Sequence, residues 1–214
     1  MKAAKAMKGE KKHPALLHLR KTDPILYHAS LPFAAELLIK KGHRRSYQQL
    51  FDSLAGAIVS QQLSTKASDT IWGRLKAACG GQVTPEALSR LRTPSMRKAG
   101  LSAAKTKSLK ELSRAVLKNE INLEALRKIP EEEAIVQLTA VWGIGRWTAE
   151  MFLMFALNRE DVFSPGDLGL RRSMEHLYNL KKDTPIKKLE TIASNWSPHR
   201  TFACRVLWKL RDQP

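Results

Sequence analysis

The stretch Leu138–Arg172 reads LTAVWGIGRWTAEMFLMFALNREDVFSPGDLGLRR, and it decides the fold of this chain. Its pattern predicts a helix, a four-residue hairpin at Trp142–Gly145, a second and apolar helix, and a loop that ends on the lone carboxylate of Asp167. Two glycines flank one apolar residue in the hairpin. Glycine adopts positive φ at little cost and lets another backbone approach closely. We therefore expect a tight connection between two helices.

The helix after the hairpin begins at Arg146 and is expected to bind an anion. The first amides of a helix have no partners within it and lie at the positive end of its dipole, so they form a seat for a phosphate. Each piece has a simpler explanation when taken alone, since Gly-x-Gly is a weak motif and an aspartate after Pro-Gly is usually a turn or N-cap residue. Together, a phosphate anchor and the isolated Asp167 suit an enzyme that acts on a nucleotide sugar.

Lysine and arginine outnumber aspartate and glutamate by 37 to 20, which gives this chain of 214 residues a formal charge of +17. Such an excess favours a polyanionic partner, because each neutralised phosphate releases condensed counterions. A membrane surface would attract the same charge, but no long apolar run or basic helix with a dominant aromatic face stands out. A basic surface that only keeps the protein soluble is the remaining alternative. We expect a nucleic acid and no membrane.

Cysteine and histidine usage argues against several classes of metal protein. Cys79 and Cys204 stand in no metal-ligand spacing, so neither an iron–sulfur cluster nor a disulfide framework is expected. The 6 histidines form no pair at zinc-like spacing. The charged start MKAAKAMKGEKKH lacks the apolar core of a secretory signal, so the protein is not expected to be secreted. Free thiols suit a reducing compartment.

Apolar residues recur with the 3.6-residue period of helices, and alternating strand patterns are nearly absent. The sequence therefore predicts an all-α protein. Residues 1–13 are interpreted as a mobile basic tail and 14–214 as one domain, with lobes at about 46–130 and at 14–45 plus 131–214. The expected helices are 22–41, 46–62, 64–79, 84–92, 102–119, 130–140, 146–157, 167–180, 184–194 and 198–211.

Two further segments have both a structural and a functional interpretation. The helix end Ile58–Ser64 carries Gln61 and Gln62, whose amides could be merely solvated or could satisfy an orphaned base edge. The following Leu63 could serve as an apolar wedge between base steps. Trp196 could belong to the core or provide a stacking surface.

Taken together, these motifs resemble the helix-hairpin-helix DNA glycosylase superfamily, and within it the 3-methyladenine DNA glycosylase II branch. The resemblance covers about residues 22–211 and looks like the compact form of that branch, without the extra N-terminal β domain of some members. The segments that carry it are Ile58–Ser64, Gly143–Ala149, Asp161–Phe163, Pro165–Gly169 and the Trp196-x-Pro198-x-Arg200 motif.

The resemblance implies a two-lobed helical bundle with a DNA-binding cleft between the lobes. The family extrudes a damaged nucleotide from the duplex and cleaves its N-glycosidic bond, in base excision repair. Asp167 falls where the family places its catalytic carboxylate, and Trp147 falls where bifunctional relatives place a Schiff-base lysine. Without an amine there, no imine forms with the sugar, so a monofunctional glycosylase that excises alkylated purines with water as nucleophile is expected.

The resemblance also assigns the remaining site residues. The expected base pocket consists of Trp147, Trp196, Met151, Leu168 and His199. The expected DNA contacts are Gln62, Leu63, Gly143, Gly145, Arg146, Thr148 and Arg200, with Gln62 and Leu63 at the gap left by the flipped nucleotide. The family often holds a monovalent cation, Na⁺ or K⁺, with hairpin carbonyls, here those of Thr139, Val141 and Ile144; no other cofactor is expected.

Double-stranded DNA with damaged bases is the expected partner of a protein that acts as a monomer, in the bacterial cytoplasm and nucleoid or in a eukaryotic nucleus. Two residues depart from the family pattern. Trp142 stands where many relatives have proline or a basic residue, and His199 stands where tyrosine or tryptophan is common. The preferred lesion is therefore not carried over from the family.

Two alternative functions fit part of the pattern. A non-enzymatic module that grips the DNA backbone would account for the charge and for Gly143 and Gly145, but not for Asp167 or the tryptophans. A glycosylase with lyase activity would need a lysine from elsewhere, such as Lys209.

Overall fold

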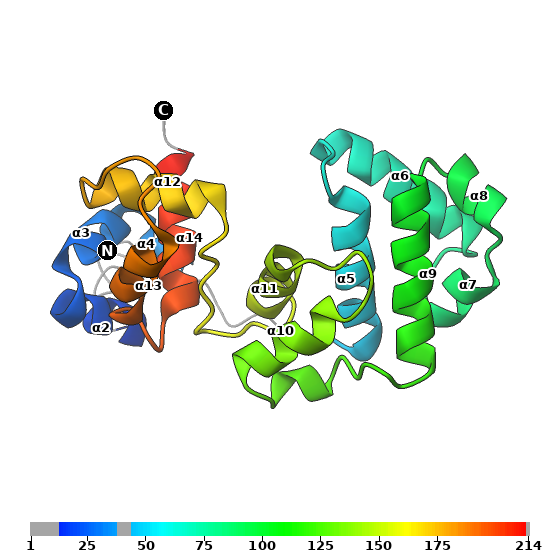
Figure 1. Cartoon of the computed structure of the whole chain (residues 1–214), viewed down its shortest axis with the longest axis horizontal. Coiled ribbons are helices and arrows are strands. Elements are labelled where there is room, and N and C mark those ends of the chain that lie inside the picture. The colour runs from blue at the N-terminus through cyan, green and yellow to red at the C-terminus, as the bar shows by residue number, and fades with distance from the viewer. Residues whose placement is uncertain (1–12, 38–43, 213–214) are drawn as a thin grey trace, which may run out of the picture. The chain divides into compact units, whose positions relative to one another are not determined.

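The computed structural model describes residues 13–37 and 44–212, and within them every regular element is helical. The predicted all-α class is confirmed. The described residues form two compact units (Figure 1). We call the unit built within His43–Leu157 the central unit, and the unit built within Met1–Gly42 and Asn158–Pro214 the terminal unit.

The central unit contains the long helices that carry its core. Its elements are α5 (Tyr47–Ser60), α6 (Thr65–Ala78), α7 (Pro85–Arg90), α8 (Thr93–Lys98), α9 (Ala103–Leu117), the short 3₁₀ helix η2 (Ala125–Arg127), α10 (Glu131–Thr139) and α11 (Arg146–Phe155). Helix α5 packs against α6, α9 and α11. Its fully buried residues Leu50, Leu54 and Ile58 recur every four residues, so one face of the helix fills the core.

The starts of the central helices are fixed by capping side chains. Ser46 and Gln49 form a reciprocal capping box at α5, in which each side chain bonds to the backbone amide of the other. Ser64 accepts the amide of Ala67 at α6, and Ser102 accepts the amide of Lys105 at α9. Each such cap typically stabilises its helix by about 1 kcal/mol.

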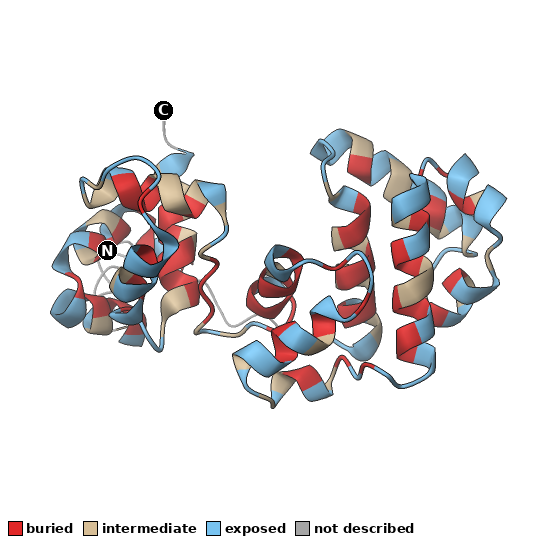
Figure 2. Cartoon of the chain, in the orientation of Figure 1, coloured by how far each residue is buried: buried red, intermediate tan, exposed pale blue. Residues whose placement is uncertain are grey.

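The terminal unit joins the two ends of the described chain. Its elements are α2 (Pro14–Thr22), α3 (Pro24–Ser30), the 3₁₀ helix η1 (Leu31–Phe33), α4 (Ala34–Leu37), α12 (Leu168–Leu177), α13 (Ile186–Ser194) and α14 (Arg200–Arg211). Helix α14 packs against α12, α3 and α4. In Figure 2 the buried residues of α14 form a nearly continuous stripe, as expected for a helix surrounded by others.

A buried polar cluster around Asp23 holds the N-terminal helices to the rest of this unit. One carboxylate oxygen, Oδ2, accepts hydrogen bonds from the hydroxyl of Tyr178 at 2.5 Å and from Nε1 of Trp196 at 2.7 Å. The other, Oδ1, accepts the amide of Leu26 at 2.9 Å. Burial and the neighbouring carboxylate raise the pKa of Tyr178 well above its usual value, so its hydroxyl stays a donor.

The predicted helices differ from the observed ones mainly at the N-terminal end. The expected helix 22–41 is broken in its described part into α3, η1 and α4, because Asp23 caps a new start and Pro32 interrupts the helical ladder. Helix α2 was not expected. Helix α8 was absent from the expected ranges, although Thr93 and Pro94 are typical of a helix start. Of the predicted tail 1–13, residues 1–12 lie outside the described residues, whereas His13 accepts the amide of Ala15 as the N-cap of α2.

The division into units also differs from the expected lobes in one segment. The stretch 131–157, which carries α10 and α11, belongs to the central unit and not with the terminal segments. The physical reason is that α11 packs directly on α5.

Candidate active site and nucleic-acid interface

The two hairpin glycines have different surroundings. Gly143 has a φ of 88°, a region that side-chain-bearing residues rarely adopt. A Cβ atom there would lie 2.7 Å from Cβ of Ser108 on α9 and closer still to its hydroxyl. Gly145 has an extended conformation, and a Cβ atom there would meet nothing within 4 Å. The hairpin is therefore seated on α9 at Gly143 and open at Gly145.

Helix α11 begins directly after Gly145, and no side chain caps its N-terminus. Its first turn also contains no acidic residue. An uncapped helix start offers amide donors and the positive end of the dipole to an anion. Thr148, expected to contact DNA, has a buried side chain whose hydroxyl accepts from Nε2 of Gln61 at 3.4 Å, so this hydroxyl is used within the protein.

Arg146, another expected DNA contact, is engaged by two carboxylates. Its guanidinium donates to both oxygens of Glu132, at 2.5 and 2.8 Å, and to Glu150 at 3.0 Å. These bonds raise the pKa of Arg146 well above its usual value. The side chain of Glu150 is almost fully buried, so this arginine compensates a carboxylate that burial would otherwise penalise.

The turn between α5 and α6 projects an apolar side chain. Gln62 is exposed and has a φ of 57°, an uncommon conformation for a residue with a side chain. Leu63 is 39% exposed. Gln61 holds this turn to the hairpin, because its Nε2 also donates to the carbonyl of Gly143 at 3.2 Å. Sequence reasoning did not assign that bracing role to Gln61.

Helix α11 exposes aromatic and thioether side chains at helical spacing. Trp147 is 50% exposed, Met151 is half-buried and Phe155 is 44% exposed. Residues four apart lie on the same side of a helix, so these three form one stripe. Trp147 and Met151 were expected in the base pocket, whereas the sequence assigned no role to Phe155. Trp142, which departs from the family pattern, is exposed. Its ring lies under Nζ of Lys107, which is 4.3 Å from the ring centre.

Asp167 lies at the N-terminus of α12 and is partly exposed. Its Oδ1 accepts the amide of Leu170 at 2.8 Å, so the carboxylate caps the helix. The same oxygen accepts Nε1 of Trp208 at 3.1 Å. The next residue, Leu168, is 59% exposed, which places an apolar side chain beside the carboxylate. Asp167 is therefore the N-cap of α12, and it is also the residue expected to be catalytic.

Trp196 does not provide a stacking surface, and this corrects the expected base pocket. Its ring is fully buried, lies edge-on to Phe163 at 5.6 Å between centres, and donates to Asp23. A ring without an exposed face cannot stack on a base, so Trp196 is a core residue of the terminal unit. The sequence had left both interpretations open.

His199 and Arg200 begin α14, and both have partners within the terminal unit. His199 is half-buried and lies edge-on to His18, with ring centres 5.7 Å apart. Burial, followed by the proximity of His18, lowers its pKa. Arg200, an expected DNA contact, donates from Nε to Oδ1 of Asp161 at 2.7 Å and from Nη2 to the carbonyl of the same residue at 2.7 Å.

The ion pair between Arg200 and Asp161 fixes the segment that precedes Asp167. Burial would raise the pKa of Asp161, but the hydrogen bonds from Arg200 and Ser197 outweigh it and hold the pKa below its usual value. Both side chains are about one third exposed. In the structure, Arg200 therefore holds this loop in place through Asp161.

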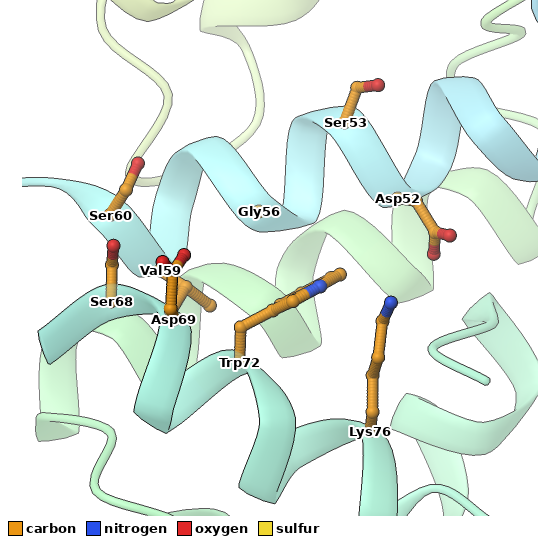
Figure 3. Close-up of a pocket in the computed structure, with 9 residues that line it drawn as sticks. All are labelled: Asp52, Ser53, Gly56, Val59, Ser60, Ser68, Asp69, Trp72 and Lys76. Atoms are coloured by element: carbon orange, nitrogen blue, oxygen red, sulfur yellow. The ribbon is translucent and has the colours of Figure 1, made fainter. Parts of the chain in front are cut away.

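A groove of about 320 Å³ lies elsewhere in the central unit, between α5 and α6 (Figure 3). The indole of Trp72 lies across it, and Nζ of Lys76 is 5.5 Å from that ring. No residue predicted for the site is among its lining residues. Those residues are Asp52, Ser53, Gly56, Val59, Ser60, Ser68, Asp69, Trp72 and Lys76.

Within residues 13–37 and 44–212, no group of three or more histidine, cysteine, aspartate or glutamate side chains could hold a metal ion. No helix in the same ranges is long and apolar enough to cross a bilayer.

The hairpin, the uncapped α11 and the carboxylate at α12 lie within a stretch that a known family model covers. The model described as "HhH-GPD superfamily base excision DNA repair protein" matches residues 55–198. This chain therefore belongs to the HhH-GPD superfamily.

Several relatives and solved structures carry related names. DNA-3-methyladenine glycosylase 1 of Schizosaccharomyces pombe is 38% identical over 162 residues, which is 74% of this chain and 71% of that protein. A DNA-3-methyladenine glycosidase from Bacillus halodurans superimposes with a TM-score of 0.82 at 33% identity, over 95% of this chain and 91% of the other. The S. pombe glycosylase Mag1, in complex with abasic DNA, superimposes with a TM-score of 0.73 at 33% identity, over 92% and 96% of the two chains.

Proposed function

We propose that this protein is a monofunctional DNA glycosylase of base excision repair, which flips alkylated purines out of duplex DNA and hydrolyses their N-glycosidic bonds. The observation that carries the proposal is Asp167, a partly exposed carboxylate fixed at the start of α12 in a chain of the HhH-GPD superfamily. The relatives named DNA-3-methyladenine glycosylase support alkylated bases as substrates. The complex of Mag1 with abasic DNA supports DNA as the partner.

The chemistry of an alkylated purine explains why one carboxylate is enough. Alkylation at N3 or N7 places a positive charge on the base, which makes it a good leaving group. Departure of the base leaves an oxocarbenium-like sugar. A carboxylate about 4 Å from that cation, at an effective dielectric near 20, stabilises it by roughly 4 kcal/mol. At about 1.36 kcal/mol per decade, this accelerates the reaction by about a thousandfold.

Asp167 has a second task in this reaction, because the sugar cation must be captured by water. A carboxylate can orient that water and accept its proton as a general base. We assign the larger share of the rate to electrostatic stabilisation, since departure of the base is the difficult event. The products are the free base and an abasic site in an intact strand.

The central unit supplies the features suited to gripping DNA. The uncapped start of α11 would receive a phosphate, and the exposed Gln62 and Leu63 would fill the gap left by the flipped nucleotide. The exposed ring of Trp147, with Met151 one turn later, suits an electron-poor cationic base. We propose that the protein acts on DNA as a monomer.

A monovalent cation at the hairpin remains part of the proposal. The carbonyl of Val141 accepts the amide of Ile144 at 3.1 Å, which leaves a second lone pair on that oxygen. Carbonyls of Thr139, Val141 and Ile144 would hold Na⁺ or K⁺, and the ion would add positive charge near the phosphate seat. Replacing K⁺ by a bulky organic cation at constant ionic strength should weaken DNA binding if this ion contributes.

The absence of lyase activity is proposed from the residue at position 147, because an indole forms no imine. The alternative lysine, Lys209, has its Nζ 2.6 Å from Glu36, so its amine is engaged in an ion pair on α14. Treating the enzyme with borohydride during turnover should trap no covalent adduct with DNA. A trapped adduct would contradict the monofunctional assignment.

Measuring the free bases released from methylated duplex DNA, resolved by chromatography, tests the proposal. Asp167→Asn should slow release about a thousandfold, to a residual rate, while binding to abasic-site DNA persists. Asp69→Asn, in the α5–α6 groove, is the matched control and should release bases at the wild-type rate. Undiminished release by Asp167→Asn would overturn the mechanism. Binding without release by the wild-type protein would favour a non-enzymatic module that grips the DNA backbone.

A further inference from the structure

Trp208 contacts the proposed catalytic carboxylate directly. It lies on α14 and is half-buried, and its Nε1 donates to Oδ1 of Asp167 at 3.1 Å. Helix α14 packs against α12, whose N-terminus Asp167 caps (Figure 1).

Two donors from different elements therefore meet at one carboxylate oxygen. The amide of Leu170 comes from the helix that Asp167 itself caps, and the indole comes from α14. A cap bond alone leaves the carboxylate free to tilt with the helix end. A second donor from a packed neighbouring helix fixes its plane and direction, because each hydrogen bond weakens steeply away from linear geometry.

The chemistry of the indole suits this position. Indole Nε1 is a donor only, and it neither titrates nor accepts in the physiological range. It cannot take a proton from Asp167, and it adds no charge beside the developing cation. A histidine or lysine in the same place would add a titrating or charged group beside the reaction.

We propose that Trp208 is a positioning residue, which orients the carboxylate of Asp167 toward the sugar of the extruded nucleotide. This inference rests on the proposed glycosylase function. A misplacement of about 1 Å at a reacting group can cost up to about a hundredfold in rate. Loss of the indole bond, with the Leu170 cap retained, should therefore cost about tenfold, within that limit.

Trp208→Phe removes the donor and keeps an aromatic ring. We expect the single-turnover rate of base release from methylated DNA to fall about tenfold, while affinity for abasic-site DNA stays within twofold. Trp72→Phe, in the α5–α6 groove, is the matched control and should leave both values unchanged. Wild-type rates in Trp208→Phe would overturn the proposal.

A double-mutant cycle separates positioning from general loss of structure. If Trp208 acts only through Asp167, Trp208→Phe should slow residual release no further in an Asp167→Asn background. An additional tenfold loss in that background would show that Trp208 acts by another route. If Asp167→Asn keeps full activity, the proposed function itself fails. If Asp167→Asn is inactive and Trp208→Phe is fully active, only the positioning role fails.

A spectroscopic test does not require Trp208→Phe to be active or stable. The indole N–H resonance of Trp208, assigned by its absence in Trp208→Phe or by backbone-linked assignment, should shift in Asp167→Asn while that of Trp72 does not. An unchanged Trp208 resonance would overturn the proposal.

Discussion

Gly143 lies so close to Ser108 of α9 that no side chain fits between them. The hairpin backbone thus rests on the central unit at a point where both the positive φ and the space demand glycine. Two residues further on, Gly145 meets neither demand. The two positions therefore allow a comparison between a glycine that the packing requires and one that it does not.

Gly143→Ala should destabilise the protein by about 1–3 kcal/mol, since it combines a strained φ with a clash against Ser108. Gly145→Ala, the matched control, should cost less than about 1 kcal/mol, because Ala is only a poorer N-cap. Denaturant unfolding gives both values. If Gly145→Ala folds normally and still weakens DNA binding, the open side of the hairpin is where the backbone approaches the phosphate. Equal stability losses in the two variants would contradict this comparison.

Trp196→Phe should mainly lower stability, whereas Trp147→Ala should mainly slow base release. Trp196→Phe leaves a void in the core and removes a donor from the buried Asp23, so unfolding should become easier by about 2–4 kcal/mol. Its base release per folded molecule should remain near wild type. Trp147→Ala should cost less stability, because its ring is half exposed, and should slow base release at least about tenfold if the ring holds the cationic base. A Trp196→Phe variant that is stable but inactive would reinstate Trp196 as a pocket residue.

His199 should make the protein less stable in mild acid. Its folded-state pKa is lowered, so the unfolded chain binds the proton more readily than the folded protein does. The free energy of unfolding should therefore fall as pH drops below about 6.5, and this loss should end once pH passes below the lowered pKa. His199→Gln should flatten this part of the stability curve, measured by denaturant unfolding at a series of pH values. An identical curve for wild type and variant would exclude this contribution.

DNA binding should depend steeply on salt. If about five phosphates are contacted, the logarithm of the binding constant should fall against the logarithm of salt concentration with a slope of about −4.5. Fluorescence anisotropy with labelled abasic-site duplex between low and physiological salt measures this slope. A flat response would show that the charge of +17 serves another purpose.

The local features of the site could be predicted because they rest on short-range rules. The Gly143 turn, the start of α11 and the cap by Asp167 each depend on residues within a few positions of one another. A 3.6-residue period also predicts helices whatever their neighbours are. For this reason the all-α class and the helix starts near Tyr47, Thr65 and Arg146 were close to the observed ones.

Side-chain partners far apart in the chain could not be predicted from the same rules. Trp196 and Asp23 are 173 positions apart, and nothing near either residue indicates that they meet. The same holds for Trp208 and Asp167, which are 41 positions apart. Arg146 was expected to contact DNA, and its ion pair with Glu132 forms only when α10 and α11 pack together.

The order of the two units along the chain has a consequence for synthesis. Every described element of the central unit comes from within residues 43–157, whereas α3 and α4 of the terminal unit pack against α14, which ends at Arg211. Domains tend to fold as units while the ribosome delivers the chain at about 5–20 residues per second. The nascent polypeptide thus emerges with its hairpin complete several seconds before Trp208 can reach Asp167. If the proposed function holds, the segment assigned to DNA binding is therefore made before the one assigned to catalysis.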